Sequence, residues 1–279
     1  MNLDFSDEQK SIKDQARRFL KDKCPTTVVR EVLDGRQSYS KELWQGAAEL
    51  GWTGAVIPEE FGGIGYGYLE LCVIAEELGR ALAPIPFSSS VYLATEAILL
   101  AGTVEQKQKY LPRLASGEII GAFAIAEGPK PPTPANIDTK LKAGTVTGTK
   151  IPVPDGHVAD FAILAAADEG GAISLAIVDL QGSGVSCKPV ETIDPSRAHA
   201  SITFHQAPAE PLGAAGDGWK IKEKIFDHAA VLIAMEQLGG ADASLGMARD
   251  FALNRYALWA AHRFVPGDQA QAGGHVHQE

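Results

Sequence analysis

The spacing of apolar residues changes twice along this chain, and this change limits the possible folds more than any other feature. Up to about residue 120, apolar residues recur three and four positions apart, as Ile12, Ala16 and Leu20 do near the start. From about Gly121 short runs of β-branched and apolar residues take over, and from Trp219 the helical spacing returns. The order predicts an α+β multidomain protein in which a sheet region separates two helical regions.

Helix start signals punctuate the first part of the chain. A capping box, in which a hydroxyl and an amide side chain each bond the other residue's backbone N–H, is predicted at Ser6 with Gln9. A second capping box is predicted at Thr103 with Gln106. Residues 68–82 are apolar nearly all round, so we expect this helix to lie at the centre of an N-terminal helical domain.

The middle of the chain reads as strands joined by tight turns. Turns are expected at Asp155-Gly156 and around Gly170-Gly171, and the Pro-rich residues 129–134 are expected to form a loop. Short strands in series with such turns predict a small antiparallel β-barrel or sandwich. The expected strands cover residues 145–149, 159–166, 172–180 and 200–204.

A long helix is expected from Trp219 to about Tyr256. A helical pattern of this length is typical of a bundle, so we expect the start of a C-terminal helical bundle. The pair Gly239-Gly240 should let another helix approach closely. The apolar stripe of the helix consists of Ile221, Ile225, Leu232, Met235 and Leu238.

These segments divide the chain into four parts. The tail lacks helical periodicity, which leaves the bundle incomplete. The parts are the N-terminal helical domain (1–120), the middle β-domain (121–213), the start of the C-terminal bundle (214–257) and the tail (258–279).

Composition excludes several classes of protein. The formal net charge is −10 and no basic cluster appears, which argues against a general nucleic-acid binder. No apolar run is long enough for a membrane span, and the N-terminus has no signal-peptide pattern. Cys24, Cys72 and Cys187 fit neither a disulfide framework nor a zinc site, so a cytoplasmic location is expected.

Two sets of polar residues could suggest a functional site, but neither pattern predicts one. His275 and His277 lie close together in sequence, but no further ligand completes a metal site with them. The serine run at residues 88–90 lacks the context of a hydrolase nucleophile and is expected as a loop or a helix cap. We therefore expect no metal site.

An ordered set of short strings resembles the acyl-CoA dehydrogenase family from about residue 3 to residue 257. Each string is weak alone, and the set is specific because its members follow one another in family order. The resemblance implies an N-terminal helical domain, a middle β-domain and a C-terminal four-helix bundle. The strings are residues 57–63, 75–80, 106–112, 114–118, 122–127 and 237–240.

The resemblance implies that the middle domain faces an FAD. Alanine replaces the usual threonine at Ala126, and the family's acidic position is kept as Glu127. Pro152 stands where an aromatic ring packs on the flavin, and Pro154 where a hydroxyl bonds it. Proline supplies no such donor. The candidate cofactor residues are Phe123, Ile125, Ala126, Glu127, Pro152 and Pro154.

The catalytic glutamate of the family has no clear counterpart. In some members it lies on the first long helix of the last domain, where Ala229 stands here. Asp227 is about 200° around the helix from Ala229, so it should face elsewhere. His228 is expected to be packed or solvated. The catalytic residue is therefore left unassigned.

The tail reads as a family segment in the wrong frame. Codons permitted for residues 258–279, with the first base removed, encode FGRPIGSFQAIKHKLADMYIK, a typical family continuation. We hypothesise a one-nucleotide insertion near codon 258 that truncates a short bacterial member of the family. The long helix would then keep an apolar stripe with few partners, which predicts poor stability or aggregation.

Three functions stay open at this point. The resemblance implies FAD-dependent α,β-dehydrogenation of an acyl-CoA thioester, by this chain or by an enzyme of which it is a subunit. Some short bacterial members pair two unlike chains, so the chain could instead be a non-catalytic partner in a heteromeric dehydrogenase. The third reading is an inactive, truncated pseudo-enzyme. The expected partners are an acyl-CoA and either a second copy or another chain of the family.

Overall fold

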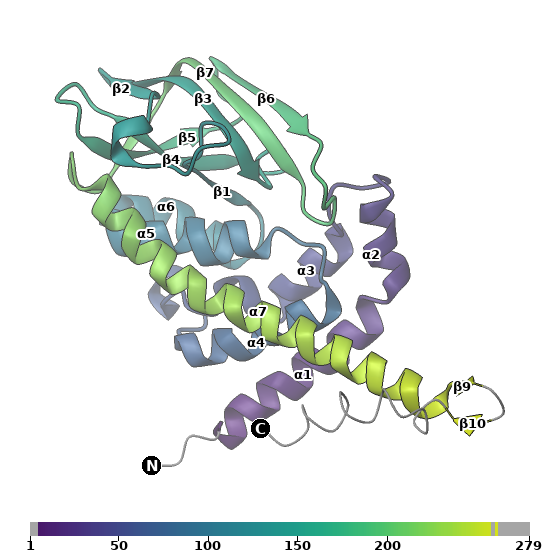
Figure 1. Ribbon diagram of the computed structural model, residues 1–279. Coiled ribbons are helices and arrows are strands. Elements are labelled where there is room, and N and C mark those ends of the chain that lie inside the picture. Colours follow the sequence, from purple (N-terminus) through teal and green to yellow (C-terminus); the bar gives the residue numbers. More distant parts are fainter. Residues whose placement is uncertain (1–4, 258–259, 262–279) are drawn as a thin grey trace.

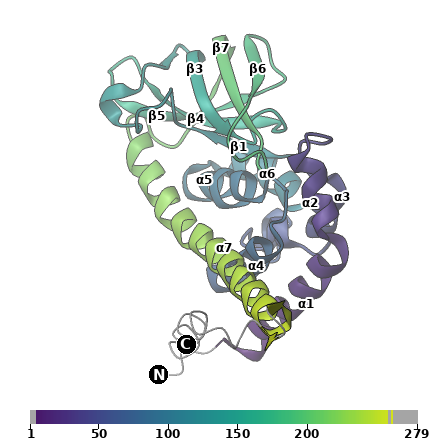
Figure 2. The same cartoon turned by 45° about the vertical axis from the view of Figure 1, so that its right-hand side comes forward.

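The computed structural model describes residues 5–257, 260 and 261. A β-sheet covers one end of a group of helices, and one long helix crosses the face of that group and reaches the sheet at its N-terminal end (Figures 1 and 2). The helices before the sheet and the helix after it are therefore packed together, although the strands separate them in sequence.

Seven helical segments and the short 3-10 turns among them precede the sheet. Both expected capping boxes are present, at Ser6 with Gln9 and at Thr103 with Gln106. The segments are α1 (Asp7–Lys23), α2 (Thr26–Leu33), α3 (Lys41–Glu49), α4 (Tyr68–Ala81), η3 (Ser88–Thr95), α5 (Glu96–Ala101) and α6 (Val104–Ala115), and the 3-10 turns are η1 (Trp52–Gly54) and η2 (Glu59–Phe61).

Helix α4 is the central helix of this group, as its apolar sequence predicts. Eight consecutive residues of it, 71–78, are buried. Glu77 is among them, and the guanidinium of Arg17 on α1 binds its carboxylate through two hydrogen bonds, at 2.7 and 2.9 Å. The pair lets a charged residue lie inside the helical core.

The serine run was expected as a loop or a helix cap, and this expectation is wrong. Ser88, Ser89 and Ser90 are buried in the π-helix η3, which packs against β1 and α7. Hydrogen bonds from distant parts of the chain make burial possible, because the hydroxyl of Ser89 donates to the Asp155 carboxylate. The hydroxyl of Ser90 accepts the N–H of Gly121.

The sheet has eight strands, and most of its strand pairs are antiparallel as expected, although two pairs are parallel, so the sheet is mixed. Most neighbouring strands are antiparallel, but β1 and β2 both run parallel to β4. The N–H of Asp160 donates to the carbonyl of Ile120, and the N–H of Ile120 donates to the Asp160 side-chain carboxylate. These two hydrogen bonds hold the starts of β1 and β4 together, so the two strands leave in the same direction. The order is β6-β7-β3-β2-β4-β5-β8, with β1 paired to β4.

The expected strands all form. The Pro-rich segment is a loop over residues 129–133, and its last proline begins a short 3-10 turn, η4 (Pro134–Asn136). The strands are β1 (Gly121–Ala124), β2 (Lys140–Lys142), β3 (Thr145–Pro154), β4 (Phe161–Ala167), β5 (Ile173–Asp179), β6 (Val185–Val190), β7 (His199–Pro208) and β8 (Glu210–Leu212).

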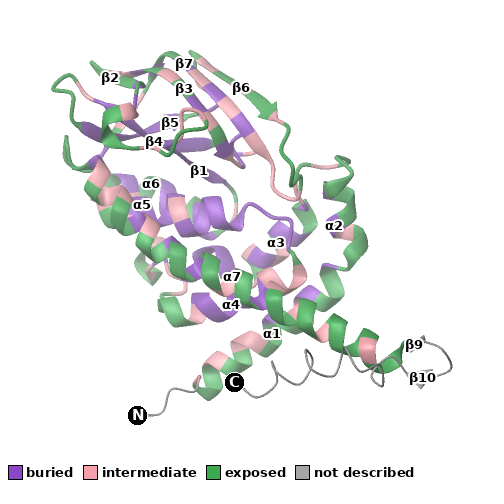
Figure 3. Ribbon diagram, viewed as in Figure 1, coloured by how far each residue is buried: buried purple, intermediate pink, exposed green. Residues whose placement is uncertain are grey.

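The long helix α7 (Gly218–Asn254) crosses α4 at very short range. A Cβ added to Gly239 would lie 1.8 Å from the carbonyl oxygen of Glu76, and one added to Gly79 would lie 1.9 Å from that of Glu236. Glycine on both helices is therefore what allows the backbones to touch, as the Gly239-Gly240 pair predicts. As far as Gly239 the inner face of α7 is buried while its outer face is exposed, and beyond Gly240 none of its residues is buried (Figure 3).

None of the described helices is long and apolar enough to cross a membrane. After α7 the backbone forms a two-stranded pair, β9 (Tyr256–Ala257) with β10 (Ala260–Ala261). The hypothesis of a shifted frame, and the histidines 275 and 277, concern residues that lie outside the described part of the chain.

Candidate functional site

The two segments singled out by the sequence meet at one edge of the sheet. The N–H of Ile151 donates to the carbonyl of Ala126 at 2.8 Å, and the N–H of Gly128 donates to the carbonyl of Ile151 at 2.9 Å. The register of β3 against β7 shifts between Lys150 and Val153, which frees Ile151 to pair with the segment after β1. The residues around Ala126 and those around Pro152 are thus neighbours.

Glu127 serves as a structural anchor at this edge. Its carboxylate accepts a hydrogen bond from Nζ of Lys150 at 2.6 Å and from the backbone N–H groups of Asp138 and Thr139 at 2.6 and 3.1 Å. Burial alone would raise the pKa of Glu127, but the hydrogen bonds from Lys150, Thr139 and Asp138 and the charge of Lys150 together outweigh it, and the pKa is lowered. A carboxylate held ionised by three donors is not free to accept a substrate proton.

Lys150 is fully buried, with 0% of its side chain exposed. Burial lowers the pKa of its ammonium group, and the facing Glu127 opposes the shift. The pair joins the end of β1 to the middle of β3, so it holds the two segments in register.

The remaining candidate side chains divide into buried and accessible ones. Phe123 and Ile125 are buried, and the ring of Phe123 packs edge to face on Phe226 of α7, with centroids 5.8 Å apart. Pro152 is exposed, and Ala126 and Pro154 are half-buried. The accessible side chains are therefore a methyl group and two pyrrolidine rings, none of which donates a hydrogen bond.

A depression of about 280 Å³ borders this edge. It lies where the loop after β1 turns back toward β2, beside the carboxylate of Glu127. Its lining consists of Glu127, Gly128, Pro129, Lys130, Pro132, Asn136, Ile137 and Asp138.

The candidate side chains at this edge supply no hydrogen-bond donor to a flavin. Two backbone segments run side by side there, and Pro152 is exposed next to them. A bound flavin needs placed donors at its ring. Ala126, Pro152 and Pro154 provide none, so only backbone N–H groups could serve.

The position at which the resemblance implies a catalytic glutamate is occupied by a buried alanine. Ala229 is 3% exposed on the inner face of α7, and Asp227 is exposed, as its angle around the helix predicts. The next carboxylate along the inner face is Glu236, which is ion-paired with Arg197. Among the described residues of this face, none is placed to take an α-proton beside Ala229.

A buried polar cluster that the sequence did not indicate joins the sheet to η3 and α7. Arg197, in the β6–β7 connection, binds the hydroxyl of Ser88 and the carboxylate of Glu236. Burial raises the pKa of the nearby Asp155 carboxyl, and the hydrogen bond from Ser89 opposes the shift. Because the partners are 39 or more residues apart, no local sequence signal reveals the cluster.

His228 takes part in a second polar contact between helices. Its Nδ1 lies 2.8 Å from a carboxylate oxygen of the buried Glu96, and the hydroxyl of Tyr68 donates to the other oxygen. The rings of Tyr68 and His228 meet edge to face with centroids 5.2 Å apart. His228 is therefore tied to the helical core at a partly exposed position, which agrees with the expectation that it is packed or solvated.

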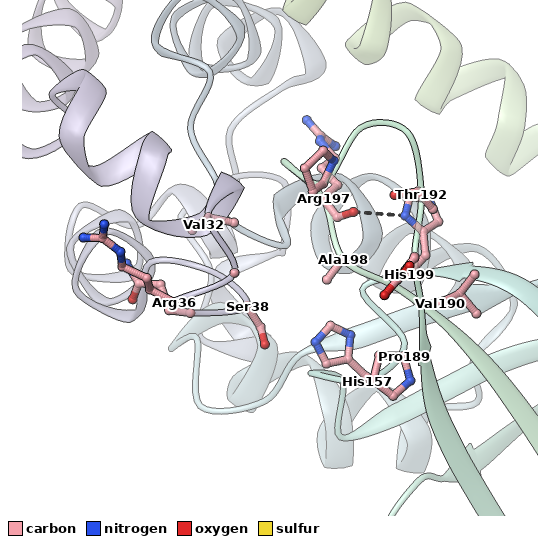
Figure 4. A pocket seen from close by; sticks show the side chains of 14 residues that line it. Val32, Arg36, Ser38, His157, Pro189, Val190, Thr192, Arg197, Ala198 and His199 are labelled. Carbon is pink, nitrogen blue, oxygen red and sulfur yellow. Dashed lines mark hydrogen bonds between the residues drawn. The ribbon is translucent and has the colours of Figure 1, made fainter.

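A second depression, of about 460 Å³, lies where the end of α2 faces the β6–β7 connection. His157 stands between the loop of Ser38 and the strand end of Pro189, and Nδ1 of His199 lies 3.0 Å from the carbonyl oxygen of Arg197 (Figure 4). Burial lowers the pKa of His157, and the other cationic side chains that line the depression are Arg36 and Arg197. No group of three metal-ligating side chains occurs among residues 5–257.

Comparison with protein families finds one match. The family model "Acyl-CoA dehydrogenase, N-terminal domain" matches residues 6–118.

Curated relatives match over most of this chain. Acryloyl-CoA reductase (NADH) of Anaerotignum propionicum is 31% identical over 264 residues, which cover 88% of this chain and 66% of that protein. The short-chain-specific acyl-CoA dehydrogenase of Megasphaera elsdenii is 31% identical over 277 residues, which cover 91% of this chain and 71% of that protein. A probable acyl-CoA dehydrogenase of Bacillus subtilis is covered over 44% of its length. The chain thus spans less than two thirds of the length of several curated relatives.

Solved structures share the fold. Butyryl-CoA dehydrogenase of Megasphaera elsdenii superposes with a TM-score of 0.90 at 26% identity, covering 98% of this chain and 76% of that one. An acyl-CoA dehydrogenase of Bacillus anthracis, solved as a complex with FAD, gives 0.90 at 26% identity, covering 97% of this chain and 48% of that one.

Proposed function

Because this chain belongs to the acyl-CoA dehydrogenase family, we propose that it serves the FAD-dependent α,β-dehydrogenation of an acyl-CoA thioester. The observation that carries this proposal is the pairing of the segment after β1 with Ile151 of β3. The resemblance assigns these two segments to the flavin, and they come together here although they lie more than 20 residues apart.

The proposed cofactor is FAD, which when bound would accept a hydride from the β-carbon of the thioester. The residues that would hold it are Ala126 with its backbone neighbours Ile125 and Glu127, the exposed ring of Pro152, and Pro154. The chain's own residues would then position the flavin ring, because the ion pair of Lys150 with Glu127 holds the segment after β1 against β3.

A non-catalytic role as partner subunit is the second candidate function. It is favoured by Ala229 at the position of the family's base, and by the lack of side-chain donors at Ala126, Pro152 and Pro154. On this alternative the catalytic residues belong to another chain of the family. We also propose a cytoplasmic location and the division at residues 120, 213 and 257.

A flavin spectrum of the purified full chain separates these functions. Protein that retains flavin absorbance and reduces a dye with butyryl-CoA supports dehydrogenation by this chain. Colourless protein that becomes active only when co-expressed with a second family chain supports the partner role. Colourless protein that no second chain activates contradicts both.

Restoring the missing donors gives a second test. The variant Ala126→Thr with Pro154→Thr adds two hydroxyls at the edge, and it should raise flavin retention above that of the unmodified chain. The control Pro132→Thr adds a hydroxyl to the neighbouring loop and should leave retention unchanged. Equal retention in all three proteins would show that the flavin does not bind at this edge.

A further inference from the structure

The half of the sheet farther from the helices presents one face to solvent. It consists of β2, β3, β7 and β6, whereas the helices contact the sheet through β1 and β5 (Figures 1 and 2). Every residue of β4 is buried, but along β3 only Val146, Lys150 and Val153 are, and accessible residues lie between them. We call the accessible side of these four strands the outer face.

The strands of the outer face carry lysine but no acidic residue. The chain as a whole is acidic, with 35 Asp and Glu against 25 Lys and Arg, yet none of its Asp and Glu lies on these four strands. Lys150 is buried and paired with Glu127. Lys140, Lys142 and Lys188 are exposed, and the ion pairs found among the described residues use other lysines. Strand pairing thus assembles a local positive surface that no single segment of the sequence shows.

Hydroxyl side chains fill the outer face between the lysines. Lys140 lies opposite Thr147 on the neighbouring strand, and Lys188 lies opposite Ser201. The nearest exposed carboxylate in the sequence is Asp138, two residues before Lys140. Away from that end, the outer face offers hydroxyls and positive charge without a carboxylate. Its other hydroxyls are those of Thr145, Thr149, Thr203 and Ser186, and the last three lie side by side on neighbouring strands.

The side chains that the outer face lacks narrow the choice of partner. Among the described residues, no large apolar side chain exposed to solvent lies on these strands, and Phe204, their one phenyl ring, is fully buried. A protein that lies on a membrane surface inserts apolar and aromatic side chains into it, and one that binds single-stranded nucleic acid stacks bases on exposed rings. A double helix demands more phosphate contacts than three lysines supply. Carboxylates on the surface of another protein remain as the complementary groups.

We propose that the outer face is a docking surface for the acidic face of another protein, whose carboxylates pair with Lys140, Lys142 and Lys188. The outer face is about 14 Å wide across its four strands and about 33 Å long over the 10 residues of β3. It is therefore smaller than the roughly 800 Å² that each partner buries in a stable complex, and exposed ion pairs are individually weak. The contact is thus transient, and charge raises its rate of formation more than its affinity.

A labelled decaglutamate peptide, titrated with the full chain and followed by fluorescence anisotropy, serves as the acidic probe. The net charge of −10 repels this peptide, so binding at low salt reports a local positive surface. Lys140→Glu with Lys142→Glu should raise the dissociation constant about fivefold or more. Lys21→Glu with Lys41→Glu makes the same change of net charge at exposed positions on α1 and α3, and it should change the dissociation constant by at most about twofold.

Further measurements separate local charge from other causes of binding. Lys140→Gln with Lys142→Gln removes the two charges without reversing them, so it should weaken binding less than the glutamate pair does. Binding should fall as salt rises to about 0.15 M, because the Debye length shortens to about 8 Å. Vesicles of phosphatidylglycerol and a decathymidine oligonucleotide represent the other occupants, and neither should bind through these lysines.

Four results would overturn the proposal. Decaglutamate does not bind at low salt, or it binds equally well to the Lys140→Glu, Lys142→Glu variant and to the control. Vesicles or decathymidine bind through the two lysines more tightly than decaglutamate, which assigns the outer face to a lipid surface or to nucleic acid. Copies of the chain associate with one another, and the glutamate pair abolishes this association. None of these measurements depends on flavin or on activity, so they stand apart from the tests of the proposed function.

Discussion

Replacing Gly239 by alanine tests whether backbone contact between α4 and α7 holds the helical core together. The added methyl carbon would lie 1.8 Å from the carbonyl oxygen of Glu76 and 2.9 Å from the backbone nitrogen of Arg80. Ordinary contacts begin at 3.4 Å, so the helices must part by about 1.6 Å at the crossing. No side-chain rotation relieves the clash, because the atoms it meets belong to the backbone of α4.

The expected loss of stability follows from two opposing effects. Overpacking a tight contact costs about 1–3 kcal/mol, and alanine in place of glycine within a helix returns about 0.5–1 kcal/mol. We therefore expect Gly239→Ala to lower the free energy of unfolding by up to about 2.5 kcal/mol. For a chain of this size that is a fall in Tm of up to roughly 10 °C.

Two other glycines of α7 supply matched controls. An added methyl carbon meets nothing within 4 Å at Gly246, and at Gly240 its nearest contact is the carbonyl oxygen of Gly79 at 3.6 Å. Gly246→Ala should therefore gain the full helical preference of about 0.5–1 kcal/mol, and Gly240→Ala should be neutral or slightly stabilising. Chemical denaturation followed by circular dichroism gives the three values. If Gly239→Ala proves as stable as Gly246→Ala, the helices do not cross at these atoms and the reasoning is refuted.

Three further predictions concern buried groups. Burial raises the folded-state pKa of Asp155, so its contribution to stability is complete below the unfolded pKa of about 3.9 and is lost as pH rises through the folded value. The free energy of unfolding of Asp155→Asn should therefore rise relative to that of the wild type between pH 4 and pH 7. A constant difference between the two proteins over this range would contradict the prediction. Burial raises the pKa of the Cys24 thiol to about 11, so iodoacetamide at pH 8 should leave Cys24 unmodified in the folded chain and label it after denaturation, as mass spectrometry of the peptides would report. Lys150→Met leaves the Glu127 carboxylate without its cation and should lower the free energy of unfolding by about 3–5 kcal/mol. Adding Glu127→Gln should restore part of this loss. A double variant no more stable than Lys150→Met alone would show that the two residues are not coupled.

Local signals in the sequence predict most of the fold. The capping boxes at Ser6 and Thr103 form as expected, because a cap depends only on residues three positions apart. The long helix and the close contact at Gly239 are also predicted, since periodicity and the missing side chain are properties of the helix itself. The parallel pairing of β1 was not predicted, because the direction of β1 depends on bonds to Asp160, far along the chain.

The candidate site is predicted in part. The sequence identifies both segments that meet at the edge of the sheet, yet it does not separate Phe123 and Ile125, which belong to the buried core, from the accessible Ala126 and Pro152. That division depends on what packs against each face of the strand. The polar cluster at Arg197 was missed entirely, because its hydrogen bonds span up to 109 residues and its serines read locally as a loop.

The contact of Gly79 with α7 has a consequence for how the chain is made. Gly79 and Gly239 are 160 residues apart in the sequence, and every strand of the eight-stranded sheet is synthesised between them. At ~5–20 residues per second the ribosome needs roughly 8–32 s to cover that distance. The face of α4 that contacts α7 therefore emerges early and stays uncovered during this time, so nascent chains should engage a chaperone until α7 leaves the exit tunnel.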